Sequence, residues 1–260
     1  MNHPLLDVAK QALEAAKAEL SRGSTAVLAT KSSPTDVVTT TDRAVEAAIK
    51  AVISAERPHD TVLGEEYGGG EAAAGTTRWI VDPIDGTVNF TYGIPDYAIS
   101  IAAEVGGVVE VGIVCDFPRN EEFIAVRGQG AELDGRRLAV TAVSTLDQAL
   151  IGTGFGYDSE RRRSQGRIVA ELVPEFRDIR RVGAAAIDLC WVACGRLDGY
   201  YEAGLKIWDH AAAALIVSEA GGTVDTALDG FDRGDLVVAA GANLFDPLAK
   251  RVLAAHAQLG

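Results

Sequence analysis

The sequence predicts an α/β protein that consists of an α+β half and an α/β half. Between residues 97 and 126, three β-rich runs are separated by turn residues such as Gly106-Gly107, which is typical of an antiparallel meander. Later in the chain, predicted strands alternate with predicted helices, as in α/β folds. No proline-rich or serine-rich linker separates the two patterns. We therefore expect one compact unit with an N-terminal half over residues 1–141 and a C-terminal half over residues 142–260.

The N-terminal half is expected to begin with two helices. Apolar residues recur at helical spacing from Pro4 to Arg22, and Gly23 is typical of a helix stop. A second helix is expected from Asp42 to Glu56. The polar segment before it, KSSPTDVVTTTD, is rich in β-branched residues and suits a loop or an irregular hairpin. Further along, we expect strands over 61–66 and 78–82, an exposed loop over 68–75, and then the meander.

The elements of the C-terminal half follow from its alternating texture. Short runs of β-branched and aromatic residues are each followed by a longer segment with helical periodicity. The expected strands are 149–155, 178–182, 197–202 and 236–240, and the expected helices are 159–173, 184–194, 208–220 and 245–257.

Charge and composition exclude several classes of partner. The 260 residues include 37 acidic and 24 basic side chains, so the formal net charge is −13. Such a surface repels nucleic-acid backbones and anionic membranes, because their non-specific attraction for proteins is electrostatic. We therefore expect no nucleic-acid and no membrane partner. If the partner is nevertheless a phosphate, a divalent metal ion is the usual agent that cancels the charge.

Cysteine usage and the N-terminal segment indicate a cytoplasmic protein. Three cysteines, Cys115, Cys190 and Cys194, are too few for a disulfide framework in a chain of this length, which favours a reducing compartment. We expect Cys190 and Cys194 to lie in the core of a helix. The first twenty residues carry charges at regular intervals, unlike a signal or transit peptide, and no run of 18 apolar residues occurs.

The segment WIVDPIDGTVNF carries the strongest chemical signal. Asp82 and Asp85 stand on either side of a Pro-Ile pair directly after an apolar strand. Pro83 fixes its own φ and restricts the residue before it, so the carboxylates are presented with little backbone freedom. Gly86 lets the backbone approach a ligand, and Thr87 is expected to cap a helix whose first amides face an anion. A capped turn with two solvated aspartates would also fit this motif alone.

Two further acidic residues stand at the ends of predicted elements. Glu65 closes a strand, and Asp209 opens an apolar helix, although each alone is also typical of a solvated edge or a helix-dipole cap. His210 is more typical of a packed or solvated side chain than of a ligand. Together, Glu65, Asp82, Asp85 and Asp209 supply four carboxylates without cysteine, a ligand set that suits Mg²⁺ or Mn²⁺ rather than zinc. The set predicts a multi-metal phosphoryl-transfer site.

With these motifs, the sequence resembles the inositol monophosphatase family of Mg²⁺-dependent, lithium-sensitive phosphatases. Both signatures of that family are present, DPIDGTVNF at Asp82–Phe90 and WDHAAAALIVSEAGG at Trp208–Gly222. The likeness extends through KSSPTDVVTTTD, GEE, RRVG and GYYE, so it covers nearly the whole chain. The resemblance implies a layered α/β/α/β/α sandwich, usually a homodimer, with a site between the two halves.

The resemblance also implies roles for individual residues on the metal side of the site. About two to three Mg²⁺ ions, for which Mn²⁺ could substitute, would be held by Glu65, Asp82, the carbonyl of Ile84, Asp85 and Asp209. Thr87 and Asp42 would form a relay that, together with Glu65 and a metal ion, activates the attacking water. Lys31 would lie in a loop that closes over the site.

On the substrate side, the resemblance implies that the amides of Gly86 and Thr87 receive phosphate oxygens. The alcohol part would be lined by Gly183, Ala185, Glu202 and Asp209. Relatives commonly carry a hydroxyl residue after this glycine, whereas this chain reads Gly183-Ala184-Ala185-Ala186. The missing hydroxyl group therefore affects the predicted identity of the alcohol. The basic cluster Arg161-Arg162-Arg163 with Arg167 is expected to be a solvated helix face rather than a second phosphate site.

The expected function is the hydrolysis of a small phosphate monoester of a polyol or sugar, with inositol 1-phosphate first. The same motifs are compatible with fructose 1,6-bisphosphatase, histidinol-phosphate phosphatase or 3′-phosphoadenosine 5′-phosphate phosphatase. A regulatory or RNA-associated protein without catalysis is a further alternative. The complete acidic set and the charge of −13 weigh against it.

Overall fold

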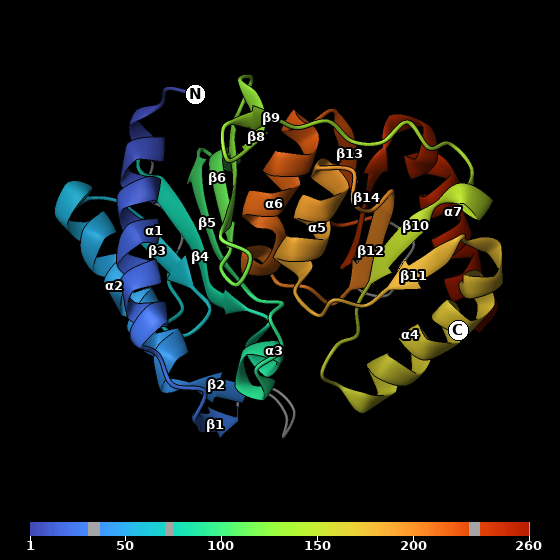
Figure 1. Ribbon diagram of the computed structural model, residues 1–260, viewed down its shortest axis with the longest axis horizontal. Coiled ribbons are helices and arrows are strands. Elements are labelled where there is room, and N and C mark those ends of the chain that lie inside the picture. Colours follow the sequence, from blue (N-terminus) through green and yellow to red (C-terminus); the bar gives the residue numbers. More distant parts are fainter. Residues whose placement is uncertain (31–36, 71–74, 229–234, 260) are drawn as a thin grey trace.

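Five layers of secondary structure make up the computed structural model, which describes residues 1–30, 37–70, 75–228 and 235–259 (Figure 1). Two sheets alternate with three layers of helices, so the layered α/β/α/β/α sandwich is confirmed. The helix pairs, from the N-terminal side to the C-terminal side, are α1 (Pro4–Arg22) with α2 (Thr40–Glu56), α5 (Ala185–Ala193) with α6 (Ile207–Glu219), and α4 (Ser159–Leu172) with α7 (Ala242–Leu259).

The first helix pair is close to its prediction. Helix α1 ends where Gly23 donates its N–H to the Leu20 carbonyl at 3.0 Å. Helix α2 begins at Thr40, two residues before the predicted start, because Thr39 and Asp42 form a capping box. Of the segment before α2, residues 31–36 lie outside the described residues; its remaining part contains β2 (Val37–Thr39), which pairs antiparallel with β1 (Val27–Thr30) in a register that is irregular near Ala29.

The seven-stranded sheet contains the predicted meander. Its order is β3-β4-β5-β6-β7-β8-β9, in which only β3 and β4 pair in parallel. The meander is confirmed and continues through two strands that were not predicted, β8 and β9. The strands are β3 (Thr61–Gly64), β4 (Thr77–Asp85), β5 (Ala98–Val105), β6 (Val108–Asp116), β7 (Glu121–Val126), β8 (Gly130–Leu133) and β9 (Arg136–Arg137).

The five-stranded sheet lies on the other side of α5 and α6. Its order is β11-β10-β12-β14-β13; the first three strands are parallel, and β14 runs antiparallel to both of its neighbours. The edge strand β13, four residues long, was not predicted. The strands are β10 (Leu150–Thr153), β11 (Asp178–Arg180), β12 (Gly199–Ala203), β13 (Gly222–Asp225) and β14 (Leu236–Gly241).

Three short helices complete the structure. They are α3 (Thr87–Tyr92) and the single 3₁₀ turns η1 (Leu146–Gln148) and η2 (Val173–Glu175). Helix α7 begins three residues before its predicted start and contains Pro247 near its N-terminal end. All strands of the seven-stranded sheet precede residue 142, and all strands of the five-stranded sheet follow it. The division of the chain at that point stays a prediction.

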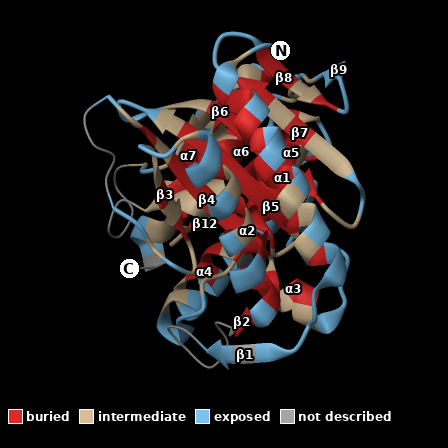
Figure 2. Ribbon diagram, turned by 90° about the vertical axis from the view of Figure 1, so that its left-hand side faces the viewer, coloured by how far each residue is buried: buried red, intermediate tan, exposed pale blue. Residues whose placement is uncertain are grey.

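Small side chains hold the middle helix layer close to both sheets. Helices α5 and α6 contribute a run of buried alanines to the cluster between the sheets, among them Ala186, Ala212 and Ala213. A Cβ on Gly112 of β6 would lie 2.6 Å from the Ala212 carbonyl oxygen, so the strand and α6 are in backbone contact. Figure 2 shows the resulting continuous buried interior across α6, β4 and β5.

No helix in the described ranges has the length and apolar character needed to cross a membrane. Cys115 and Cys190 are buried free thiols, and Cys194 is half-buried. The core position predicted for Cys190 is therefore confirmed, whereas Cys194 lies just past the end of α5.

Candidate active site

A β-bulge in β4 places two aspartates on one face of the sheet. Residues three apart in a regular strand point to opposite faces, because the side-chain period is two. Here Asp82 pairs with Ser100 and Asp85 pairs with Ala98, so three steps along β4 correspond to two along β5. The extra residue turns both carboxylates toward α5 and α6. Pro83 lies within this bulge, where its missing N–H costs no ladder hydrogen bond.

Parallel pairing brings Glu65 beside Asp82. Gly64 at the end of β3 is in register with Val81, and the N–H of Glu65 donates to the Val81 carbonyl at 3.2 Å. Glu65 therefore lies beside Asp82 on the neighbouring strand. The end of β3 and the bulge of β4 supply three of the four predicted carboxylates.

The fourth carboxylate comes from the first turn of α6. The hydroxyl of Ser100, the cross-strand partner of Asp82, donates to the Trp208 carbonyl at 3.4 Å, directly before Asp209. The Asp209 Oδ2 atom accepts the N–H of Lys206 at 2.6 Å, which closes the N-terminal end of the helix. Asp209, which belongs to the C-terminal half of the chain, thus lies near the same ends of β3 and β4.

The electrostatics of these side chains show that they act on one another. Burial raises the pKa of Asp82 well above its ordinary value, and the negative charges of Glu65, Asp85 and Asp209 raise it further. Burial likewise raises the pKa of Asp209, with contributions from Asp85 and Glu65. The pKa of Asp85 is raised to about 7, mainly by burial, although the Ala186 N–H lowers it. Burying like charges together is costly unless a cation compensates them.

The donor set fits divalent cations, although no cage is preformed in the described part of the chain. There, no three Asp, Glu, His or Cys side chains have the arrangement of a metal-binding group. One oxygen of each aspartate instead accepts a backbone N–H: Asp82 from Ile84 at 3.0 Å, Asp85 from Ala186 at 2.7 Å, and Asp209 from Lys206. A carboxylate has about four lone-pair positions, so acceptor capacity remains for a hard cation.

The raised pKa of Asp85 predicts a pH dependence for the metal-free protein. Its pKa is about 7 in the folded state against the ordinary aspartate value of 3.8, so the folded state binds the proton more tightly. The charged carboxylate then destabilises the fold, increasingly as the pH rises from about 4 to 7. In EDTA, Asp85→Asn should raise the melting temperature more at pH 8 than at pH 4. An equal effect at both pH values would contradict the assignment.

Thr87 connects the aspartates to α2, but not as the predicted helix cap. The cap of α3 is Gly86, at φ 90°, with no side-chain hydrogen bond. A left-handed residue at the cap directs the Thr87 hydroxyl back toward the sheet, where it lies 3.2 Å from Asp42 Oδ1 and 3.0 Å from the Ile84 carbonyl oxygen. Asp42 is fully buried, and its other oxygen accepts the Thr39 N–H at 2.8 Å. The predicted pair of Thr87 and Asp42 is therefore in hydrogen-bond contact.

The two halves of the chain meet at Gly86. A Cβ there would lie 2.8 Å from the Asp96 carbonyl oxygen and 3.2 Å from the Cβ of Ala184. Asn89 of α3 donates its amide hydrogens to the carbonyls of Asp96 at 2.7 Å and Val182 at 3.0 Å. These contacts hold the turn before α5, with Gly183 and Ala185, against the turn before α3.

Glu202 faces the same space from β12. Successive strand residues alternate between faces, so Tyr200 and Glu202 point toward α5 while Tyr201 and Ala203 point toward α4 and α7. The Tyr200 hydroxyl donates to Glu202 Oε2 at 2.5 Å. A Cβ on Gly154 would lie 1.9 Å from the same oxygen, so only glycine leaves room for this carboxylate.

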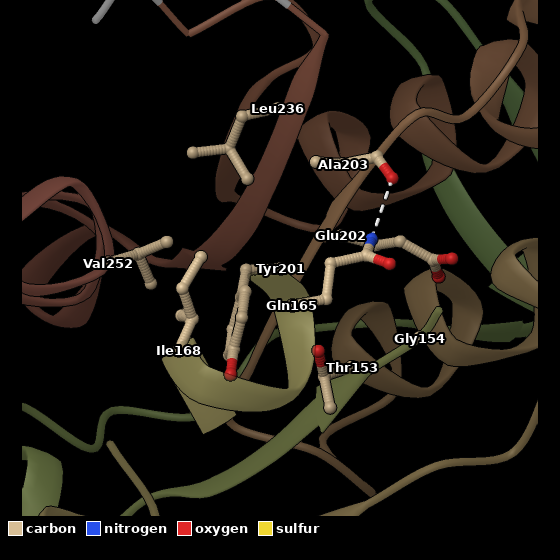
Figure 3. A pocket seen from close by; sticks show the side chains of 9 residues that line it. All are labelled: Thr153, Gly154, Gln165, Ile168, Tyr201, Glu202, Ala203, Leu236 and Val252. Atoms are coloured by element: carbon tan, nitrogen blue, oxygen red, sulfur yellow. Dashed lines mark hydrogen bonds between the residues drawn. The ribbon is translucent and has the colours of Figure 1, made fainter. Parts of the chain in front are cut away.

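A small cavity lies mainly on the other face of β12, although its lining includes Glu202 and Gly154. It lies between the sheet and helices α4 and α7, and Ile168, Leu236 and Val252 form much of its lining (Figure 3). Gln165 donates to the Ala203 carbonyl at 3.0 Å at its edge, whereas the Glu202 carboxylate points toward Gly154 (Figure 3). The apolar lining is typical of a packing gap rather than of a phosphate site.

Several site residues were not predicted from the sequence. Ser100 lies in no motif, and Tyr200 belongs to GYYE without a predicted role; their hydroxyls donate to the Trp208 carbonyl and to the Glu202 carboxylate, respectively. Arg181 lies with a guanidinium nitrogen 2.4 Å from where a Cβ on Gly183 would be. In the basic cluster of α4, Arg161 pairs with Asp235 at 2.7 Å and Arg163 pairs with Glu160. Lys31 lies outside the described residues.

The fold and the site together define a class of layered α/β proteins whose site is built from carboxylates between two sheets. The model of the inositol monophosphatase family matches residues 2–259, and the chain belongs to this family. The family resemblance expected from the two signatures is thereby confirmed.

Individual relatives are similar over most of the chain. An inositol-1-monophosphatase of Mycobacterium bovis is 47% identical over 220 residues, 82% of this chain and 76% of that protein. A protein named Nus factor SuhB of Escherichia coli K12 is 41% identical over 85% of both chains. The solved structure of extragenic suppressor protein suhB from Bartonella henselae is 35% identical, with a TM-score of 0.88 over 96% of this chain and 98% of that chain.

Proposed function

We propose that this protein is a phosphoric monoester hydrolase that converts inositol 1-phosphate to inositol and phosphate. The observation that carries the proposal is the convergence of Glu65, Asp82, Asp85 and Asp209 near the first turns of α5 and α6, where the charge of Glu65 helps to raise the pKa values of all three aspartates. The name of the Mycobacterium bovis relative, inositol-1-monophosphatase, supports the substrate. Mg²⁺ is the proposed cofactor, with Mn²⁺ as a possible substitute, because all donors are oxygens.

The metal side of the site would be formed by the four carboxylates and the Ile84 carbonyl. When bound, Mg²⁺ lowers the pKa of water and neutralises phosphate charge. The Thr87 hydroxyl, held by Asp42, accepts a hydrogen bond from the attacking water while it donates its own proton to the Asp42 carboxylate. Glu65, which follows the end of β3, would accept a hydrogen bond from the other O–H group of the same water. These residues place the water in line with the phosphorus, and catalysis is mostly positioning and charge neutralisation.

The alcohol side of the site would be formed by the C-terminal half. The amides of Gly86 and Thr87 receive phosphate oxygens, and Gly183 and Ala185 line the space for the ring. One oxygen of Glu202 is occupied by the Tyr200 hydroxyl, so the other can accept a hydrogen bond from a substrate hydroxyl. A polyol presents several such donors, which favours an inositol or sugar phosphate as substrate.

Two alternatives differ from this proposal in kind. Other phosphatases of the same superfamily, including those for fructose 1,6-bisphosphate, histidinol phosphate and 3′-phosphoadenosine 5′-phosphate, would use the same carboxylates. The name of the Escherichia coli relative, Nus factor SuhB, favours a binding function as the second candidate. The net charge of −13 favours a small metal-bound substrate over a nucleic acid.

A panel of phosphate esters tests the proposal and separates these alternatives. Phosphate release is measured with Mg²⁺ for inositol 1-phosphate, fructose 1,6-bisphosphate, histidinol phosphate and 3′-phosphoadenosine 5′-phosphate. We expect the highest kcat/KM for inositol 1-phosphate. A higher value for another ester reassigns the substrate, and no release from any ester rejects the phosphatase.

Metal dependence is a separate prediction. We expect EDTA to abolish phosphate release, Mg²⁺ to restore it, and both lithium and excess Mg²⁺ to inhibit, because a weakly held ion must leave before the product does. Phosphate release at graded Mg²⁺ and lithium concentrations checks this. Full activity in EDTA, or restoration by zinc alone, would contradict it.

Three further proposals concern the protein as a whole. The family resemblance supports a homodimer in solution, the low cysteine content supports a cytoplasmic location, and the pattern of predicted elements supports two halves, 1–141 and 142–260, that act as one unit. Light scattering at several protein concentrations checks the first of these.

A further inference from the structure

Helix α2 carries two buried carboxylates on one face, only one of which is explained by the proposed mechanism. Asp42 and Glu46 are four residues apart, so their side chains lie one above the other, and neither is exposed to solvent. Asp42 caps the helix and holds Thr87. Glu46 takes part in neither interaction and points toward the end of β3.

The Glu46 carboxylate holds the turn that carries Glu65. Its Oε2 atom accepts the N–H of Glu66 at 2.7 Å, and its Oε1 atom accepts the N–H of Tyr67 at 3.1 Å. On the other side of Glu65, a Cβ on Gly64 would lie only 1.9 Å from Glu46 Oε1. The carboxylate is therefore fitted against the backbone both before and after Glu65.

This arrangement needs both oxygens of a carboxylate. A buried charge is retained only where hydrogen bonds compensate its lost hydration, and the two N–H groups provide them. A glutamine of the same shape has one acceptor and would direct its NH₂ group at the second N–H. Aspartate would keep the charge, but its side chain is one CH₂ group shorter and would not reach both N–H groups.

We propose that Glu46 is a positioning residue that clamps the turn after β3 to helix α2 and thereby fixes where the Glu65 carboxylate stands in the active site. One helix then orients both groups that contact the attacking water, Thr87 through Asp42 and Glu65 through Glu46. The proposal rests on the proposed function, because it assigns Glu65 to the active site.

Two substitutions at this position separate positioning from charge. In both Glu46→Gln and Glu46→Asp, we expect kcat for inositol 1-phosphate to fall ~10- to 100-fold, as is typical for partners of metal-site residues, with KM nearly unchanged. Mg²⁺ binding measured by titration calorimetry should weaken in both variants. If Glu46 acts only through its negative charge, Glu46→Asp keeps wild-type activity and Mg²⁺ affinity, and the proposal is overturned.

Matched variants on the same helix control for stability. Ile53→Val shortens a fully buried side chain of α2 away from the site, and Glu56→Gln repeats the charge change at an exposed position. Both should keep kcat and Mg²⁺ affinity, even where Ile53→Val lowers the melting temperature as much as Glu46→Gln does. If Ile53→Val lowers kcat equally at equal stability, the effect of Glu46 is general destabilisation and the proposal fails.

A third variant and a metal-free measurement complete the test. Gly64→Ala displaces the carboxylate from the opposite side and should reproduce the loss in kcat. If the Glu46 variants do not fold, unchanged kcat in Gly64→Ala overturns the proposal.

Amide hydrogen exchange at Glu66 and Tyr67 should quicken in all three variants in EDTA, and unchanged exchange would contradict the clamp. Because exchange needs no activity, it still decides on Glu46 if wild type hydrolyses no ester, a result that rejects only the proposed function.

Discussion

Replacing Asp85 by asparagine is expected to lower kcat for inositol 1-phosphate by roughly a hundred- to a thousandfold while the fold is preserved. Asparagine keeps the shape of the side chain and an oxygen that can accept the Ala186 N–H, which Asp85 accepts at 2.7 Å. Only the negative charge and one acceptor are lost. Because that charge lies close to those of Glu65 and Glu202, its removal relieves repulsion in the metal-free protein.

Aspartate-to-asparagine substitutions at two other positions provide a parallel test and a control for Asp85→Asn. Asp209→Asn should behave alike, since burial and the charges of Asp85 and Glu65 raise the pKa of Asp209. Asp147→Asn, at an exposed position in η1, should change neither kcat nor stability. The melting temperature of both site variants in EDTA should equal or exceed that of wild type. Near wild-type turnover in either variant would show that the ligand assignment is wrong.

Replacing Thr87 by alanine is expected to lower kcat by about a hundredfold or more and to change KM little. The hydroxyl lies between Asp42 Oδ1 and the Ile84 carbonyl oxygen, so it is oriented before substrate binds. Its interaction with the attacking water strengthens as hydroxide character develops, which makes the loss specific to the transition state. Asp42 also loses a hydrogen-bond donor, which should destabilise the fold by about 1–2 kcal/mol.

Thr87→Ser separates the two effects of the alanine variant. Serine keeps the hydroxyl and should retain much of the rate, while the missing methyl group costs some stability. Steady-state kinetics and melting temperatures of both variants give the comparison. If Thr87→Ala remained active but less stable, the hydroxyl would be structural and the relay would be refuted.

The motif around Asp82 predicted which acids matter, but only strand register explains how they come together. Asp82 and Asp85 are three residues apart, a spacing that puts side chains on opposite faces of a regular strand. The sequence predicted a strand that ends at Asp82, whereas β4 continues to Asp85 through a bulge. Local propensity cannot show a bulge, because its stabilising contacts come from β5, which lies farther along the chain.

Residues that act through others were harder to predict than the acids themselves. Glu46 in the sequence is one acid on an amphipathic helix, where an exposed position is the usual expectation. Its function depends on Gly64, 18 residues later, which leaves room for its carboxylate. The predicted cap at Thr87 was wrong for a similar reason, because the left-handed conformation of Gly86 sends the hydroxyl to Asp42. Both outcomes are set by tertiary contacts.

Mg²⁺ titration by calorimetry of metal-free wild type and of Asp209→Asn tests the central claim most directly. The claim is that carboxylates from both halves of the chain, with three near the ends of β3 and β4 and one on α6, form one cluster that binds the divalent cations together. Wild type should bind about two to three ions per chain. Asp209→Asn should bind fewer ions, or bind them at least about tenfold more weakly. If the isotherms of the two proteins coincide, Asp209 is not part of the site and the account is contradicted.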